Sequence, residues 1–110
     1  MPDRTRVTVQ PRHELPAVDE AGLVAARYAD LLLAAARDVG IQRWADYLAP
    51  LPDRLRDDEP RALRLTALRA RAAYGAKDSV RDALPAELTE PFLESIDRLL
   101  RVLARRELDR

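Results

Sequence analysis

The residues that decide the fold are Leu23 to Val39, LVAARYADLLLAAARDV, the longest apolar stretch of the chain. Wound as an α-helix at 100° per residue, this stretch and Glu20 just before it gather their charges on about a third of the circumference. A surface helix buries one apolar stripe of about 100°, and this segment offers about twice that width. The sequence therefore predicts a central helix that packs against neighbours on two sides.

Larger residues form one apolar side of this helix, and alanine dominates the other. The larger-residue stripe, which we expect to face the core, consists of Val24, Tyr28, Leu31, Leu32, Ala35 and Val39. The alanine stripe would let a second helix approach closely because its side chains are short. We predict a helix–helix interface there, within the bundle or in a homodimer, formed by Ala25, Ala29, Leu33 and Ala36.

The composition favours a single folded helical domain. Of 110 residues, 47% are hydrophobic and 35% charged, only three are Gly and none is Cys. Abundant Ala, Leu and Arg with little Gly favour helix, and this length suits one domain. The absence of cysteine excludes disulfides, thiol chemistry and cysteine-ligated metal sites.

No segment predicts secretion or membrane insertion. The longest apolar stretch is interrupted by Arg27 and Asp30, and the first 22 residues contain no apolar core of a secretory signal. We therefore expect a cytoplasmic protein without a membrane partner.

Residues 1–18, MPDRTRVTVQPRHELPAV, differ in kind from the rest. Arg6 to Gln10 alternates polar and apolar residues, the period of a half-buried strand, and the segment after it is interrupted by two prolines. We interpret residues 1–18 as an extended arm, or as a short strand completed by another chain, with Val7 and Val9 as candidate contacts. His13, the only histidine, is expected to be solvated.

The rest of the chain alternates helical patterns with proline or glycine. The central helix is expected to begin near Asp19 and to end at Gly40. After it, the pattern predicts a short helix at 41–49, a connector at 51–59 and a long helix at 60–74. A short segment at 80–84, capped by Asp78 or Ser79, follows. The last predicted element is a long helix from its N-cap Thr89 to about Glu107. The predicted fold is all-α: a compact bundle of three long helices plus one or two short ones over residues 19–110, preceded by the arm.

The helix at 60–74 is the most basic feature of the chain. It carries four arginines and no acid, and two apolar stripes, one of Leu63, Ala67, Ala70 and Tyr74 and a second of Leu65, Leu68 and Ala72. One of these stripes could cover the alanine stripe of the central helix. Arg61, Arg64 and Arg71 are candidate anion-binding residues, although pairing with carboxylates such as Glu87, Glu90 and Glu94 is the simpler interpretation.

No pattern of catalytic, cofactor-binding or metal-binding residues occurs. The chain has no P-loop, nucleophile elbow or H-E-x-x-H motif, and Asp57 to Glu59 lack the glycine-turned loop of a calcium site. We therefore predict no catalytic residue, cofactor or metal.

The function predicted from the sequence is a small helical protein–protein interaction or assembly module, an adaptor or regulator, that binds a protein partner or itself as a homodimer. One alternative is a nucleic-acid-binding regulator that uses Arg6 and Arg12 of the arm together with the arginine-rich helix. The formal net charge of zero counts against this alternative. A second alternative is a small all-helical enzyme that binds an anionic metabolite.

Overall fold

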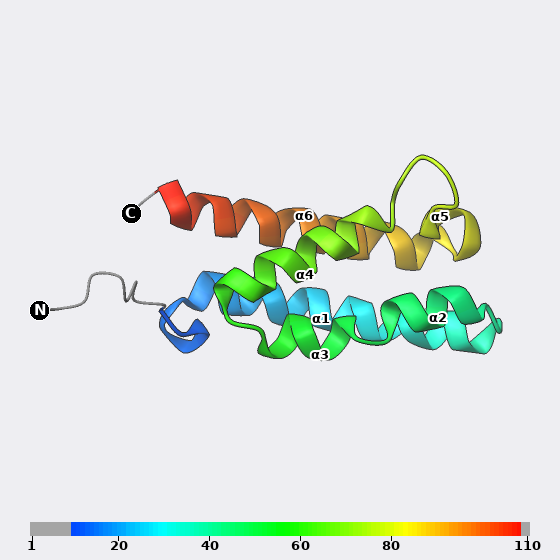
Figure 1. Cartoon of the computed structure of the whole chain (residues 1–110), viewed down its shortest axis with the longest axis horizontal. Coiled ribbons are helices and arrows are strands. Elements are labelled where there is room, and N and C mark those ends of the chain that lie inside the picture. Colours follow the sequence, from blue (N-terminus) through cyan, green and yellow to red (C-terminus); the bar gives the residue numbers. More distant parts are fainter. Residues whose placement is uncertain (1–9, 109–110) are drawn as a thin grey trace, which may run out of the picture.

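The computed structural model describes the backbone of residues 10–108 and the side chains of residues 10–106. The elements, in order, are a 3₁₀ turn η1 (Arg12–Glu14) and the helices α1 (Pro16–Asp38), α2 (Gln42–Leu48), α3 (Leu51–Asp57), α4 (Pro60–Ala72), α5 (Val80–Ala83) and α6 (Ala86–Leu108) (Figure 1). No strand occurs within residues 10–108. The all-α prediction with three long helices is confirmed, although three short α-helices accompany them rather than one or two.

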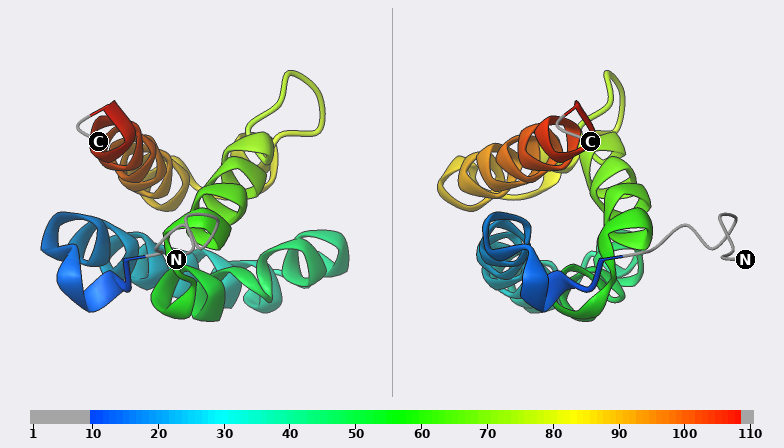
Figure 2. Two further views of the ribbon diagram at one scale, coloured as in Figure 1. Left: turned by 60° about the vertical axis from the view of Figure 1, so that its left-hand side comes forward. Right: turned by 90° about the vertical axis from the view of Figure 1, so that its left-hand side faces the viewer.

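α1 is the central helix. It packs most extensively on α6, and on its other side against α3 and α2. Both α6 and the consecutive pair α2–α3 run back along α1 in the opposite direction, and Figure 2 shows α1 between them. The prediction of a helix with partners on two sides is therefore confirmed.

The buried side of α1 is centred on the alanine stripe and not on the larger residues. Ala25, Ala29 and Ala36 are fully buried, whereas Leu31 is 50% exposed and Val39 60% exposed. The prediction that the larger-residue stripe faces the core is wrong for these two residues. Because alanine side chains are short, the neighbouring helices can approach α1 closely along this line. Leu32 and Leu33 fill the space on either side of it.

α3 lies where the sequence predicted a connector. Pro52 falls in its first turn, where the missing N–H of proline costs no helical hydrogen bond. Leu51 and Leu55, one turn apart, are fully buried in the core. Trp44 on α2 is also buried.

α6 covers α1 with a single apolar side formed by Phe92, Ile96, Leu99 and Leu103. The helix begins at Ala86, so the prediction of Thr89 as its N-cap is wrong. The Pro85 carbonyl accepts from the N–H groups of Leu88 and Thr89, both at 3.0 Å, and this starts the helix one turn earlier. Pro91 consequently lies inside α6.

α4 crosses the molecule diagonally and joins α3 to α6 (Figure 1). Leu63, Ala67 and Ala70 form its buried side. Tyr74, just beyond the helix, is buried, and its hydroxyl donates to the carbonyl of Thr89 in α6. This contact fixes the C-terminal end of α4 against α6.

The ends of two elements agree with the sequence. Gly40 adopts φ +75°, the left-handed conformation that glycine tolerates, directly after α1. Ser79 caps α5, since its Oγ accepts from the N–H of Arg81 at 3.0 Å.

Residues 12–18 pack on the bundle, although the sequence predicted them as part of the arm. α1 begins at Pro16, three residues before the predicted Asp19, and Arg12 is only 5% exposed. Asp19 does not cap the helix; its carboxylate Oδ1 accepts from Arg12 Nε at 3.0 Å. The predicted strand, with Val7 and Val9, lies outside the described residues apart from Gln10.

Candidate functional site

The side of α4 that faces away from the bundle exposes two neighbouring large apolar side chains. We call this surface the outer face of α4, and all its members are exposed: Arg61, Arg64, Leu65, Leu68, Arg69 and Ala72. Leu65 is 66% exposed and Leu68 44% exposed. Two large apolar side chains therefore lie side by side in water.

Helical geometry explains why these leucines are exposed. Leu63 faces the core, and at 100° per residue Leu65 lies roughly 200° around the helix from it. Leu65 and Leu68 are three positions apart, so they are neighbours on one side of the helix. The expectation that one of the two stripes of this helix could cover the alanine stripe of α1 is wrong, because α4 packs on α6 and α3, while α6, α3 and α2 surround α1.

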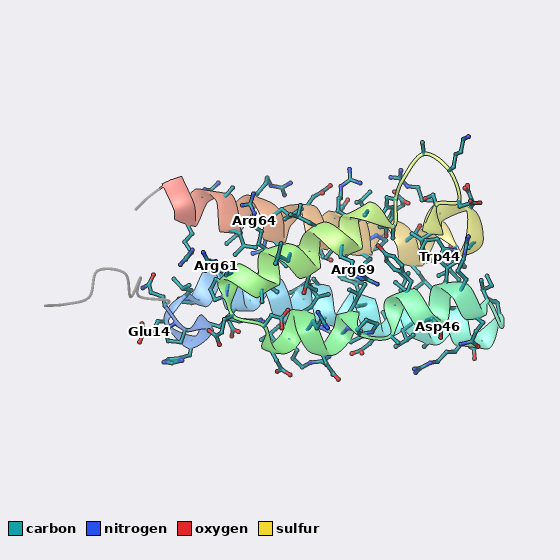
Figure 3. The ribbon with its side chains drawn as sticks, viewed as in Figure 1. Glu14, Trp44, Asp46, Arg61, Arg64 and Arg69 are labelled. Carbon is teal, nitrogen blue, oxygen red and sulfur yellow. The ribbon has the colours of Figure 1, made fainter. Side chains whose placement is uncertain are left out.

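Arginines border the two leucines. Arg61, Arg64 and Arg69 project along α4 in Figure 3. The Arg69 guanidinium carbon lies 4.8 Å from the centroid of the Tyr47 ring, and the Tyr47 hydroxyl donates to the Arg69 carbonyl at 2.6 Å. These contacts hold Arg69 at the edge of α4 nearest to α2.

Of the predicted anion-binding residues, the structure leaves Arg61 and Arg64 on the outer face of α4 and turns Arg71 away from it. Arg71 Nε donates to Asp97 Oδ1 of α6 at 3.0 Å. Asp97 is not among the acids that the sequence suggested as partners. Arg71 therefore ties α4 to α6.

A groove of about 360 Å³ lies between α3 and α4 beside Leu65. Its lining residues are Arg54, Asp58, Ala62, Leu65, Thr66 and Arg69. The one acid in this lining is engaged, because Asp58 Oδ2 accepts from Thr66 Oγ1 at 2.7 Å. The groove therefore combines apolar groups from α4 with two guanidinium groups, those of Arg54 and Arg69, and one carboxylate, that of Asp58.

The electrostatic character of this surface is set by the sequence of α4. No acidic residue occurs between Glu59 and Asp78. The outer face of α4 thus offers hydrogen-bond donors and positive charge around apolar side chains. Such a surface is suited to bind a group that is both apolar and negatively charged.

The four predicted helix-interface residues lie elsewhere. Ala25, Ala29 and Ala36 are fully buried and Leu33 is 8% exposed. The chain's own helices pack around them, so a second copy cannot reach them in the folded bundle. The homodimer stays a prediction and requires another surface.

Arg12, named in the nucleic-acid alternative, is buried in the bundle and is not available to a phosphate. Arg6, from the same alternative, lies outside the described residues. His13 is exposed, and its Nε2 lies 3.8 Å from Glu14 Oε2.

Neither a metal site nor a membrane span is found in the described part of the chain. Within residues 10–106, no three His, Cys, Asp or Glu side chains come together as a metal site would require. No helix between residues 10 and 108 is apolar and long enough to cross a membrane.

Sequence reasoning identified the stripe of Leu65, Leu68 and Ala72 but did not assign it as a site, and it missed Arg54. The sequence contained a signal for this exposed stripe. The helix at 60–74 carries two apolar stripes, and the other two long helices can bury their apolar sides against each other, which leaves one stripe of α4 without a neighbour. Comparison of the chain with protein-family models, with curated proteins and with solved structures found no match.

Proposed function

We propose that the protein is a small helical interaction module that binds a protein partner through the outer face of α4. The observation that carries this proposal is the pair of exposed leucines, Leu65 and Leu68, set among arginines on one helix. Isolated exposed leucines are ordinary on protein surfaces, but adjacent ones framed by charge are typical of interaction sites.

Energetics favour a partner that brings apolar groups of its own. Full burial of a leucine is worth about 1.5–3 kcal/mol relative to exposure. With Leu65 66% and Leu68 44% exposed, covering both would contribute roughly 2–3 kcal/mol. A phosphate backbone or a small anionic metabolite offers little apolar surface and would leave most of this free energy unused.

The dimensions of α4 fit a short helical partner. Its 13 residues extend over about 20 Å. Arg61, Leu65, Leu68 and Ala72 are spaced like the anchor positions of helices that pack against one another. A contact over this length is small, so we expect a transient complex with a micromolar dissociation constant.

Site-specific crosslinking tests the proposal. A photoreactive phenylalanine analogue is placed at Leu65 in the full chain, expressed in its own cells, and a matched chain carries it at Ala34, which is exposed on α1. We expect discrete protein adducts from position 65 that disappear with Leu68→Gln, and none from position 34. Equal adduct patterns at both positions, or none at position 65, would contradict the proposal.

Nucleic acid is the competing partner, since the outer face of α4 carries no acid. Retention of the chain on duplex DNA at about 0.15 M salt, lost as the salt rises and lost with Arg61→Ala, would support that alternative instead.

A further inference from the structure

We infer that the outer face of α4 receives an amphipathic helix whose apolar stripe is bordered by Asp or Glu. This inference rests on the proposed function and specifies the partner of the same surface. It is based on where the charges lie relative to the leucines and on which other occupants the described residues exclude.

Positive charge borders the leucines on the side toward α3. There, Arg69 and Arg54 line the groove next to Leu65. On the side toward α6, the Arg71 guanidinium already pairs with Asp97 of α6. A partner with carboxylates along the border that faces α3 would match this order of charges.

The groove provides a place for an apolar anchor. Its volume of about 360 Å³, beside Leu65 and Ala62, can receive one large apolar side chain from a partner helix. With Arg54 and Arg69 at its edges, a carboxylate one turn from that anchor would lie near a guanidinium group. The anchor and its neighbouring acid together define the partner's chemistry.

A second copy of this chain fits the surface poorly. Two outer faces of α4 in contact would bring arginines against arginines, and like charges in an interface are unfavourable. In the described chain, the other exposed large apolar side chains that a second copy could present are Leu23, Leu31 and Val39, which are eight positions apart and form no adjacent pair. The acids beside the two leucines of α1 are already paired, since Glu20 accepts from Arg98 and Asp30 from Arg56, each at 2.8 Å.

Two synthetic helical peptides with the same leucine stripe test the inference against the full chain. One peptide carries Glu along one border of the stripe, and the other carries Lys at the same positions. By fluorescence anisotropy at low salt, we expect the Glu peptide to bind with a micromolar dissociation constant and the Lys peptide at least tenfold more weakly. Binding of the Glu peptide should weaken as salt rises.

Variants of the chain assign the effect to α4. Leu65→Gln should weaken binding of the Glu peptide about tenfold. The double variant Arg61→Glu, Arg69→Glu should bind the Lys peptide more tightly than the Glu peptide. Arg27→Glu, on the exposed side of α1, is the matched charge-reversal control and should leave both affinities unchanged. Circular dichroism confirms that each variant folds.

Several results would overturn the inference. Equal affinity for both peptides, or a preference that survives the double arginine reversal, would show that charge does not select the partner. If neither peptide binds while position 65 still crosslinks to a protein, the proposed function stands and this partner class is wrong. If position 65 gives no adduct and duplex DNA displaces the Glu peptide, both proposals fail.

Discussion

Arg12 Nη1 donates a hydrogen bond of 2.7 Å to the backbone carbonyl of Leu55, which joins the first turn of the described chain to α3. The same nitrogen donates to the Asp58 carbonyl at 3.1 Å, and Nε donates to Asp19 at 3.0 Å. One buried guanidinium thus holds η1, α1 and the α3–α4 junction together. That junction sets the position of the α3–α4 groove.

Replacing Arg12 with alanine should destabilise the fold. The carbonyl groups of Leu55 and Asp58 would lose their donor, and Asp19 would lose its ion pair, although its side chain is 38% exposed and partly solvated. We expect the free energy of unfolding to fall by about 2–4 kcal/mol, measured by urea denaturation. Arg27→Ala, at an exposed position on α1, is the control and should stay within about 0.5 kcal/mol. Similar midpoints for the two variants would contradict the role assigned to Arg12.

Gly22→Ala should be destabilising for a related reason. A Cβ at Gly22 would lie 2.5 Å from Arg12 Nη2 and 2.9 Å from the Leu55 carbonyl oxygen. Because the carbonyl belongs to the backbone, relief requires a shift of α3, and we expect a loss of about 1–3 kcal/mol.

Gly75→Ala is the matched control for Gly22→Ala. A Cβ there would meet only the Ala72 carbonyl oxygen, at 3.6 Å, which is ordinary contact. Its melting temperature should be unchanged or slightly raised, because alanine restricts the unfolded chain more than glycine does. A Gly22→Ala protein as stable as Gly75→Ala would show that Arg12 does not lie over this glycine.

Enlarging the alanine stripe should separate the helices. Ala29→Leu places three extra carbon atoms at a fully buried position in α1, and we expect a loss of about 2–3 kcal/mol or a shift in helix packing. Ala34→Leu, exposed on the same helix, should change the free energy of unfolding by less than about 0.5 kcal/mol. Thermal denaturation followed by circular dichroism compares them, and equal tolerance of both would argue against close packing along Ala25, Ala29 and Ala36.

Tyr74 should make the fold sensitive to alkaline pH. Burial raises the pKa of Tyr74 well above its ordinary value of about 10, the Glu90 carboxylate adds to this increase, and Arg81 and Arg71 oppose it. Above pH 10 the unfolded chain therefore loses this proton while the folded chain keeps it. The stability that this raised pKa contributes is fully present below pH 10. The free energy of unfolding then falls as the pH rises from 10 toward the higher pKa of Tyr74 in the folded chain.

Tyr74→Phe separates this effect from general alkaline unfolding. The variant leaves the Thr89 carbonyl without the hydroxyl donor, so we expect it to be about 1–2 kcal/mol less stable at pH 7. It should also lose less stability than the parent between pH 9 and 11, by urea titration at each pH. An unchanged slope over this range would show that Tyr74 is not the group responsible.

The sequence predicted the parts of the fold that depend on local pattern. The periodicity of α1 indicated partners on two sides, glycine marked its end, and serine marked the start of α5. Pattern shows which residues share a side of a helix, but it does not show which side a neighbour occupies. For this reason the larger-residue stripe of α1, with Leu31 and Val39, was wrongly placed in the core.

The features that sequence reasoning missed depend on contacts between distant residues. Arg12 resembles a solvated residue of an arm until its acceptors, 43 and 46 positions away, are known. The exposure of Leu65 and Leu68 likewise depends on which helices already surround α1. The candidate surface was therefore visible in the sequence as a stripe, while its position on the outside required the structure.

The most direct test of the central claim is a titration of the isotope-labelled full chain with the Glu-bordered peptide, followed by backbone amide chemical shifts. We predict that the largest changes fall on the outer face of α4, at Arg61, Leu65, Leu68 and Ala72, with smaller changes at Arg54 across the groove. No change at a saturating concentration of peptide, or changes centred on Leu23 and Leu31 of α1, would contradict the claim that α4 is the binding surface.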